Sequence, residues 1–426
     1  LLRDMELVPE EALQDTLFLG ELGLNGEIKK VKGVLPIVQE AAKSGIRRVV
    51  VPGENAMEAA VIPGITVWGV NCLNDLLAAL NHPELETEKV YQPRIRAEDL
   101  LREGTGQDTG DFREVAGQEN AKRGAEIAAA GFHNLLMIGP PGVGKSMVAG
   151  RIPGILPPLT LKESLEVTGI FSVAGLLPPG QALITRRPFY APHHTVTQAA
   201  LIGGGSGIPR PGMVSLAHRG VLFLDELPEF RKNVLDGMRQ PMEERKVQIA
   251  RSAGMVTYPS DFILVAAMNP CPCGYYPDRN KCRCTQPQIE KYLGKISGPI
   301  LDRIDLCVEL HPVDILHLQK TKTEKSSEDM KRQIRHARER QAERFAGTDC
   351  RFNGDIRSAQ VEEYCPLGEG QKVMEQLYRT LQLSARVYHR ILKTARTIAD
   401  LEDREEITGE HLLEAACYRP SETYWN

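Results

Sequence analysis

Short runs of apolar residues without an intervening polar residue are the main pattern in the middle of the chain. Three such runs lie at residues 135–138, 221–224 and 262–268. Strands that are covered on both faces of a sheet have no polar side, so these runs predict buried strands of a parallel sheet. The first run is followed by a glycine-rich turn and a segment that reads as a helix. The pattern therefore favours an α/β fold.

The ends of the chain have different patterns. The first part alternates strand-like and helix-like segments and contains Asn25-Gly26, which is a strong hairpin signal. A polar stretch rich in turn residues follows and predicts a linker. From about residue 327 the apolar residues recur with the helical period, which predicts a small helical lid. We expect four parts, namely a partial α+β domain at 1–82, the linker at 83–110, the core at 111–315 and the lid at 316–426.

Composition narrows the class of protein. The 426 residues are 42% hydrophobic and 25% charged, which is typical of a globular protein with two or three domains. The net charge of −4 gives no general attraction to nucleic acid, so binding of that kind would need local basic patches. No uncharged apolar run approaches the roughly 18 residues of a membrane span, so we expect no membrane association.

The segment after the first apolar run carries a complete phosphate-binding motif. It fits G-x-x-x-x-G-K-[ST] and lies between a predicted strand and a predicted helix, as the motif requires. Glycines allow close approach of the backbone to phosphate, the lysine would bridge the β- and γ-phosphates of ATP, and the serine would ligate Mg²⁺. The loop comprises Gly139, Pro140, Pro141, Gly142, Val143, Gly144, Lys145 and Ser146.

Polar residues end the other two apolar runs. Asp225 and Glu226 follow residues 221–224, and Asn269 follows residues 262–268. Ligands of open α/β sheets bind at the carboxyl ends of the strands. We expect Asp225 to hold Mg²⁺, Glu226 to orient the attacking water, and Asn269 to position that water or the γ-phosphate. A role for Asn269 in the turn before Pro270 is the alternative.

Four cysteines follow Asn269 directly. Cys271, Cys273, Cys282 and Cys284 form the pattern C-x-C-x₈-C-x-C. Four thiolates in one loop can complete the tetrahedral shell of a structural Zn²⁺ ion. The spacing differs from the commoner C-x₂-C pairs, and buried free thiols or a redox pair are the alternatives.

The order of these motifs resembles the AAA+ ATPases. The segment "DFREVAGQENAKRGAEIAAAG" is similar to their entry segment, which implies an adenine pocket near Val115, Gly117 and Gln118. "GPILDRIDLCVEL" resembles the region of the arginine finger, which implies that Arg303 reaches the γ-phosphate of a neighbouring subunit. "LSARVYHRILKTARTIADL" resembles the lid helix whose early arginine, here Arg386, contacts nucleotide. Structural ion pairs are the alternative for both arginines.

Longer segments resemble one particular AAA+ family. "RPFYAPHHTVTQAALIGGGSGIPRPGMVSLAHRGVLFLDELPEF" and "NPCPCGYYPDRNKCRC" are similar to the bacterial magnesium-chelatase-like family called YifB or ComM. The resemblance runs over essentially the whole chain. It implies a hexameric cytoplasmic ATPase, with some members acting as DNA helicases that drive branch migration during natural transformation.

The long interval between Lys145 and Asp225 indicates an insert. In relatives of this kind the insert forms a hairpin that faces the central pore. A second hairpin is predicted by the polar and apolar alternation of "PMEERKVQIARSAGMVTYP". Its bases Arg245, Lys246 and Arg251 are candidates for phosphate contacts with DNA, and a solvated face is the alternative. His193 and His194 have no partner at a recognisable spacing, so a structural role is expected.

The N-terminal part resembles the proteolytic domain of Lon through "GELGLNGEIKKVKGVLPIVQEAAKSGIRRVVVP". By that similarity Leu35 occupies the place of the catalytic lysine. Leucine can neither accept a proton nor activate a serine, so we expect an inactive, partial Lon-like domain.

These observations predict ATP-driven movement on DNA by a homo-oligomeric ring. A motor that remodels a protein partner shares every nucleotide residue named above and is the first alternative. A nucleotide-dependent switch with little turnover is the second alternative.

Overall fold

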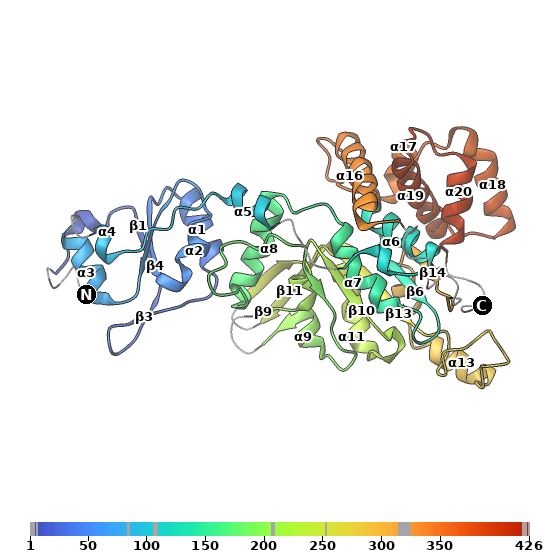
Figure 1. Ribbon diagram of the computed structural model, residues 1–426, viewed down its shortest axis with the longest axis horizontal. Coiled ribbons are helices and arrows are strands. Elements are labelled where there is room, and N and C mark those ends of the chain that lie inside the picture. Colours follow the sequence, from blue (N-terminus) through green and yellow to red (C-terminus); the bar gives the residue numbers. More distant parts are fainter. Residues whose placement is uncertain are drawn as a thin grey trace. The chain divides into compact units, whose positions relative to one another are not determined.

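The computed structural model describes residues 5, 7–82, 86–104, 110–205, 209–251, 254–313, 325–419 and 424, and at residues 86, 87, 103 and 251 only the backbone. The chain divides into two compact units (Figure 1). The first unit comprises Leu1–Gly106 and Pro158–Arg186. The second comprises Gln107–Pro157 and Arg187–Asn426. Among the described residues, no helix combines the length and the apolar character needed to span a membrane.

The first unit is built on a small parallel sheet with the strand order β1-β4-β5. Its central strand β4 (Arg48–Pro52) pairs with β1 (Thr16–Phe18) and with β5 (Thr66–Val70). The predicted Asn25-Gly26 turn lies between the short antiparallel strands β2 (Glu21–Leu22) and β3 (Ile28–Lys29). The helices are α1 (Val34–Lys43), α2 (Ala56–Ala59), α3 (Leu73–Asn81), α4 (Glu86–Lys89) and α5 (Ala97–Glu103).

Two parts of this unit differ from the expected division. Residues 86–104 do not form a separate linker, because Val90 and Ala97 are buried in the cores of the first unit. The expected insert between Lys145 and Asp225, which follows the phosphate-binding loop (P-loop), contains the helix α8 (Leu161–Ala174). Thr160 caps this helix, and the helix packs against α1. The N–H of Gly33 donates to the Ser172 carbonyl at 3.1 Å. The insert therefore gives a helix to the first unit, whereas its glycine-rich part forms a short antiparallel pair of strands in the second unit.

The second unit contains a parallel five-stranded sheet with the order β14-β6-β13-β10-β7. The predicted runs form β6 (Leu135–Ile138), β10 (Val221–Leu224) and β13 (Ile263–Met268), which are buried along their whole length. The outer strands are β7 (Phe189–Tyr190) and β14 (Leu306–Glu309). The predicted α/β fold with a parallel sheet is confirmed.

Helices cover this sheet and complete its core. The helices α6 (Glu119–Gly131) and α7 (Lys145–Ile155) contact the strands, and alternate residues of β6, β10, β13 and β14 join them in one apolar cluster. The remaining helices of the core are α9 (Gln198–Ile202), α10 (Met213–Leu216), α11 (Lys232–Gly237), α12 (Arg239–Glu244), α13 (Gln286–Leu293) and α14 (Gly298–Leu301).

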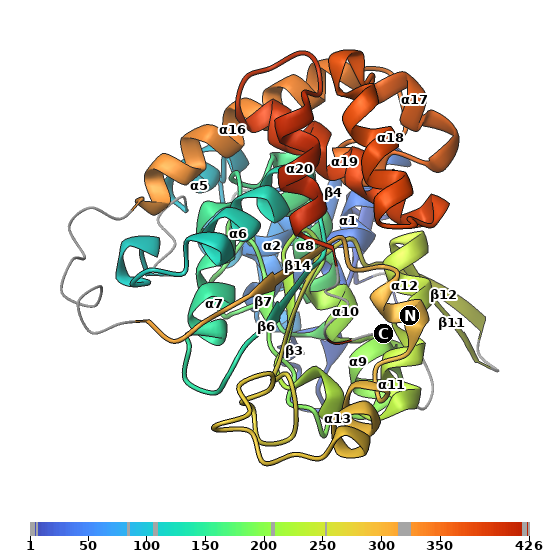
Figure 2. The same ribbon diagram turned by 90° about the vertical axis from the view of Figure 1, so that its right-hand side faces the viewer.

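The C-terminal lid is helical, as predicted. Its longest helices α16 (Ser327–Arg344) and α19 (Ala385–Leu401) pack on α6 and share the core of the sheet. The lid is completed by α17 (Val361–Tyr364), α18 (Gln371–Thr380) and α20 (Gly409–Cys417). Within this unit the lid lies at one end, and α13 lies at the opposite end (Figure 2).

The second predicted hairpin is present. The strands β11 (Lys246–Arg251) and β12 (Gly254–Pro259) are antiparallel, and the hairpin projects from the unit (Figure 2). Val247 and Ile249 are buried while Lys246, Gln248 and Ala250 are exposed, which matches the predicted alternation. A shorter pair of strands is formed by β8 (Gly203–Gly204) and β9 (Arg210–Pro211), and β8 contacts β11.

Candidate functional site

The P-loop joins the carboxyl end of β6 to the first turn of α7. Gly142 and Gly144 have φ angles of +80° and +94°, which a residue with a Cβ adopts only at a cost. These glycines turn the chain so that α7 begins at Lys145 and its free N–H groups face the loop. Backbone N–H groups at a helix N-terminus attract anions, so the loop is suited to phosphate.

Lys145 is held inside this loop. Its Nζ donates to the carbonyl oxygens of Gly139 and Pro140 at 2.7 and 2.9 Å and to Asn269 Oδ1 at 3.1 Å. Burial lowers the pKa of the Lys145 ammonium, and the carboxylates of Asp225 and Glu226 oppose that shift. The structure thus brings Lys145 and Asn269 together, although 124 positions separate them in the sequence.

The two carboxylates lie on the other side of the same cleft. Ser146 Oγ donates to Asp225 Oδ2 at 2.8 Å, which places a hydroxyl and a carboxylate together as ligands for Mg²⁺. The chain turns sharply at Glu226, which has a φ of +53° and donates its N–H to Asp225 Oδ1 at 2.9 Å. The cleft has a volume of about 360 Å³ and is lined by the loop from Pro141 to Met147 together with Asp225, Glu226 and Asn269.

His194 is a member of this site that sequence reasoning missed. Its Nδ1 lies 3.2 Å from Glu226 Oε2. It follows β7, which is paired with β10, so both side chains emerge at neighbouring strand ends. Because β7 has only two residues, it forms no apolar run that would predict a strand from the sequence. The contact between His194 and Glu226 could therefore not be predicted.

The residues expected near the adenine ring form a tight turn before α6. Val115 is buried, and Gly117 and Gln118 both have positive φ angles, of +60° and +57°. The Gln118 amide donates to the carbonyls of Val143 at 3.3 Å and His311 at 2.6 Å. This turn is therefore tied to the P-loop by a hydrogen bond.

Arg303 and Arg386 lie together, but at the amino ends of the strands, whereas the P-loop cleft lies at the carboxyl ends. Arg303 lines a small cavity with Asn134, Phe262 and Asp305, which directly precede β6, β13 and β14. The P-loop follows the other end of β6, and a four-residue strand is about 13 Å long. Neither arginine lines the P-loop cleft of its own chain.

Ion pairs hold both arginines at that edge. The Arg303 guanidinium pairs with Glu243 and lowers the pKa of that carboxyl, and it also donates to the Pro299 carbonyl at 2.7 Å. Arg386 Nη1 donates to Asp302 Oδ2 at 2.8 Å. Since Asp302 is the neighbour of Arg303, the two guanidinium groups belong to one surface of the subunit.

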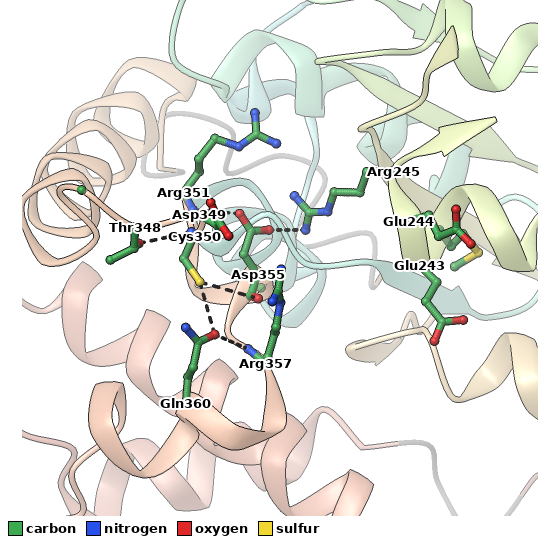
Figure 3. A pocket seen from close by; sticks show the side chains of 13 residues that line it. Glu243, Glu244, Arg245, Thr348, Asp349, Cys350, Arg351, Asp355, Arg357 and Gln360 are labelled. Atoms are coloured by element: carbon green, nitrogen blue, oxygen red, sulfur yellow. Dashed lines mark hydrogen bonds and ion pairs between the residues drawn. The ribbon is translucent and has the colours of Figure 1, made fainter. Parts of the chain in front are cut away.

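The three bases of the predicted hairpin have different surroundings. Arg245 directly follows α12 and pairs with Asp261 at 3.0 Å and with Asp355 of the lid, toward which it points in Figure 3. Lys246 is exposed at the start of β11. Arg251 ends the same strand, and its side chain lies outside the described part of the structure.

The four cysteines of the loop after β13 converge. Their sulfur atoms all lie within 4.8 Å of one another. Cys271 Sγ is 3.4 Å from Cys273 Sγ and 3.8 Å from Cys282 Sγ, and Cys273 and Cys282 are separated by 3.6 Å. A tetrahedral zinc site with Zn–S bonds of about 2.3 Å has sulfur–sulfur distances of about 3.8 Å. The cluster fits such a site.

Family profiles match most of the chain. A family described as "Magnesium chelatase, subunit ChlI" matches residues 111–318, and "Magnesium chelatase, subunit ChlI C-terminal" matches residues 324–419. A third profile, "Subunit ChlI of Mg-chelatase", matches residues 1–55.

Individual proteins are similar over nearly the full length. The uncharacterized protein YifB of Escherichia coli is 41% identical over 423 residues, which are 98% of this chain and 80% of that protein. The competence protein ComM of Haemophilus influenzae is 40% identical over 412 residues, which are 94% of this chain and 77% of ComM. Lon protease 2 of Bacillus subtilis is 26% identical over 237 residues, which are 48% of this chain and 41% of that protease.

Proposed function

The chain belongs to the YifB/ComM family of magnesium-chelatase-like AAA+-type ATPases, and from that premise we propose that it is an ATP-hydrolysing motor that moves DNA. The motor is a ring of identical chains, six in number by the family resemblance. Its substrate would be single-stranded or branched DNA that recombines during natural transformation. The protein would act in the cytoplasm.

The observation that carries this proposal is the arrangement of polar groups around one cleft. Lys145, Ser146, Asp225 and Asn269 are linked by hydrogen bonds of 2.8 to 3.1 Å across the carboxyl ends of three strands. When ATP is bound, Lys145 would meet its phosphates. Mg²⁺, which would be held by Ser146 and Asp225, offsets phosphate charge. Glu226 would orient and polarise the attacking water.

The position of the arginines supports an assembly of several chains. Arg303 and Arg386 are separated from their own P-loop by the length of the sheet, so a nucleotide that they contact has to belong to a neighbouring subunit. Such a head-to-tail interface forms a ring when the rotation between neighbouring chains closes. We therefore propose that Arg303 is the arginine finger and that Arg386 acts beside it, also from the neighbour.

The hairpin supports the assignment of DNA contacts, with one change. Arg245 is held by ion pairs with Asp261 and Asp355, so its guanidinium group is already engaged within its own chain. We assign the phosphate contacts to Lys246 and Arg251 at the two ends of β11. Asp261 gives Arg245 a structural role instead.

A protein substrate is the second candidate, and one observation favours it. Met255, near the tip of the hairpin, is 68% exposed. A flexible apolar side chain at a tip is suited to gripping a polypeptide. The two candidates make opposite predictions for the effect of DNA on ATP hydrolysis.

The first testable prediction concerns that effect. The parent chain should hydrolyse ATP several-fold faster with single-stranded or branched DNA than without DNA, measured as phosphate release. Lys246→Ala should reduce the stimulation, because it removes a charge that meets the DNA backbone. Lys232→Ala, on the exposed side of α11, is the matched control and should be stimulated like the parent.

Two further variants separate the nucleotide chemistry from the DNA question. Lys145→Ala should lose nucleotide binding, whereas Glu226→Gln should bind ATP and lose steady hydrolysis. An ATPase that hydrolyses ATP at the same rate with every DNA would contradict the DNA motor and favour the protein substrate. A parent that binds ATP with almost no turnover would favour the nucleotide switch.

The four-cysteine loop completes the proposal. We assign a structural Zn²⁺ ion to Cys271, Cys273, Cys282 and Cys284, since their sulfur distances match a tetrahedral shell. Four protein ligands leave no open position, so this ion would organise the loop and take no part in hydrolysis.

A further inference from the structure

The first half of the four-cysteine loop lies beside the proposed nucleotide site. Gly139 N–H donates to the Met268 carbonyl at 3.2 Å, and Lys145 Nζ donates to Asn269 Oδ1 at 3.1 Å. Cys271 lies two positions after Asn269. The chain that ends β13 thus runs along the P-loop immediately before it reaches the first sulfur of the cluster.

Gly274 makes a third contact with the P-loop. Its φ is +86°, and a Cβ on it would lie 2.5 Å from Pro141 Cδ and 3.0 Å from Pro141 Cγ. Atoms that are not bonded do not approach so closely, so only glycine allows this packing. A hydrogen bond of 3.0 Å from Gly274 N–H to the Cys271 carbonyl closes the turn that holds Cys271, Cys273 and Gly274 together.

The second half of the loop is anchored elsewhere. Cys282 and Cys284 precede Thr285, which caps the N-terminus of α13. Cys282 is buried and lies 3.8 Å from Cys271 by sulfur positions. A metal ion bonded to all four sulfurs would therefore fix the turn that touches Pro141 to the start of α13.

We propose that the four-cysteine loop is a zinc-dependent clamp on the P-loop, in which the metal holds Gly274 against Pro141 and Asn269 beside Lys145. Loss of the metal frees the turn between Cys271 and Gly274 and weakens nucleotide binding. The inference rests on the proposed nucleotide site. It adds that a second, distinct metal site controls the affinity of that site.

The test uses a variant that keeps all four sulfurs. Gly274→Ala should retain about one zinc ion per chain, because every ligand is present. Its new methyl group has to move away from Pro141, so the clamp is displaced. We expect the Kd of a fluorescent ADP analogue, measured with Mg²⁺ present, to rise about tenfold.

Gly347→Ala is the matched control. Gly347 has a similar φ of +77°, but a Cβ on it would meet no atom within 4 Å. It therefore carries the same backbone strain without a contact, and its affinity for the ADP analogue should equal that of the parent. This control separates the contact with Pro141 from the cost of a left-handed alanine.

Removal of the metal provides the second measurement. Cys282→Ser should lose zinc by metal analysis and bind the ADP analogue at least tenfold more weakly. If that variant fails to fold, phenanthroline can strip zinc from the folded parent, with circular dichroism to show that the fold persists. The Kd should rise to the same extent and recover when zinc is returned.

Three results would overturn the clamp. They are a purified parent without zinc, a zinc-free protein with unchanged affinity for the ADP analogue, and a Gly274→Ala variant that binds both zinc and the analogue like the parent. A Gly274→Ala variant that loses zinc would also count against it. A parent that binds no nucleotide at all would refute the proposed function as well, so the two failures can be distinguished.

Discussion

The Nδ1 atom of His194 lies 3.2 Å from one carboxylate oxygen of Glu226. Side-chain hydrogen bonds to charged groups contribute about 1.5–3 kcal/mol. We therefore regard His194 as a positioning residue for Glu226. It acts through that carboxylate and not on the nucleotide.

This contact gives a prediction that a merely structural role would not. His194→Ala should lower kcat for ATP about tenfold, while KM stays close to that of the parent, because the loss affects the reacting step. His194→Asn should retain most of the activity, since the amide nitrogen of asparagine can replace Nδ1. Steady-state kinetics at saturating Mg²⁺ measure both parameters.

The neighbouring histidine is the control. His193 Nδ1 lies 2.9 Å from Thr195 Oγ1, and the centroid of its ring lies 4.0 Å from that of His194. His193→Ala keeps the ring that contacts Glu226, so it should lower kcat much less than His194→Ala does. Equal losses of kcat in both alanine variants, or no rescue by asparagine, would contradict a specific role of His194.

A small network of ion pairs around Asp261 joins the hairpin of β11 and β12 to the lid. This carboxylate is only 4% exposed and accepts from Arg219 at 2.7 Å, from Arg245 at 3.0 Å, and from Arg351 of the lid. Arg245 directly precedes β11, so one buried carboxylate connects the base of the hairpin with the lid. A pocket lies beside this network, between the end of α12 and the lid, and Figure 3 shows Arg245 and Arg351 among the residues that line it.

Breaking this network should loosen both elements. Removing one partner of a buried ion pair costs about 3–5 kcal/mol, because the remaining charges stay buried. Asp261→Asn should therefore speed amide hydrogen exchange in β11 and in residues 349–355 by more than about 100-fold, for the amides that exchange when this network breaks. Asp349→Asn, at an exposed position of the same pocket, should change exchange little, and similar rates in both variants would contradict the network.

The proposed assembly can be tested with two variants, one at the amino ends of the strands of the sheet and one at their carboxyl ends. A chain with Arg303→Ala has an intact P-loop, and a chain with Lys145→Ala has an intact Arg303. Each should be nearly inactive alone. If Arg303 acts on the neighbouring site, mixed rings restore about a quarter of the interfaces, because each such interface takes one intact half from each chain.

The measurement is ATP hydrolysis after the two variants are mixed and allowed to exchange subunits. The same mixture with Lys145→Ala and Glu226→Gln chains is the control, since both changes damage the same half of the interface. Recovery in neither mixture, with subunit exchange shown by labelled chains, would place Arg303 within its own subunit or outside catalysis.

Local patterns were sufficient for the fold and for much of the cleft. The buried strands follow from uninterrupted apolar runs, and the P-loop follows from glycines at fixed spacing before Lys145 and Ser146. These signals depend on neighbours in the chain, since burial and φ are properties of a short segment. Asp225 and Asn269 could be placed as well, because the carboxyl ends of parallel strands share one edge.

The division of the chain could not be predicted in the same way. Residues 161–174 have the pattern of a helix, but no local signal shows that this helix packs on α1 in the first unit. Val90 and Ala97 likewise lie in a polar stretch that looks like a linker, yet they are buried. Burial depends on which distant surface is available, and that is decided only when the chain folds.

The sequence by itself determined the α/β class, the phosphate loop, the acids that end β10 and the cysteines able to bind zinc. Only the tertiary structure decided that His194 contacts Glu226 and that Gly274 packs on Pro141. It also decided that Asp261 forms an ion pair with Arg245. Finally, it placed Arg303 and Arg386 at the end of the sheet opposite their own P-loop. The physical reason is that helical and strand preferences arise between near neighbours, whereas these contacts join residues that only the packing of the strands brings within reach.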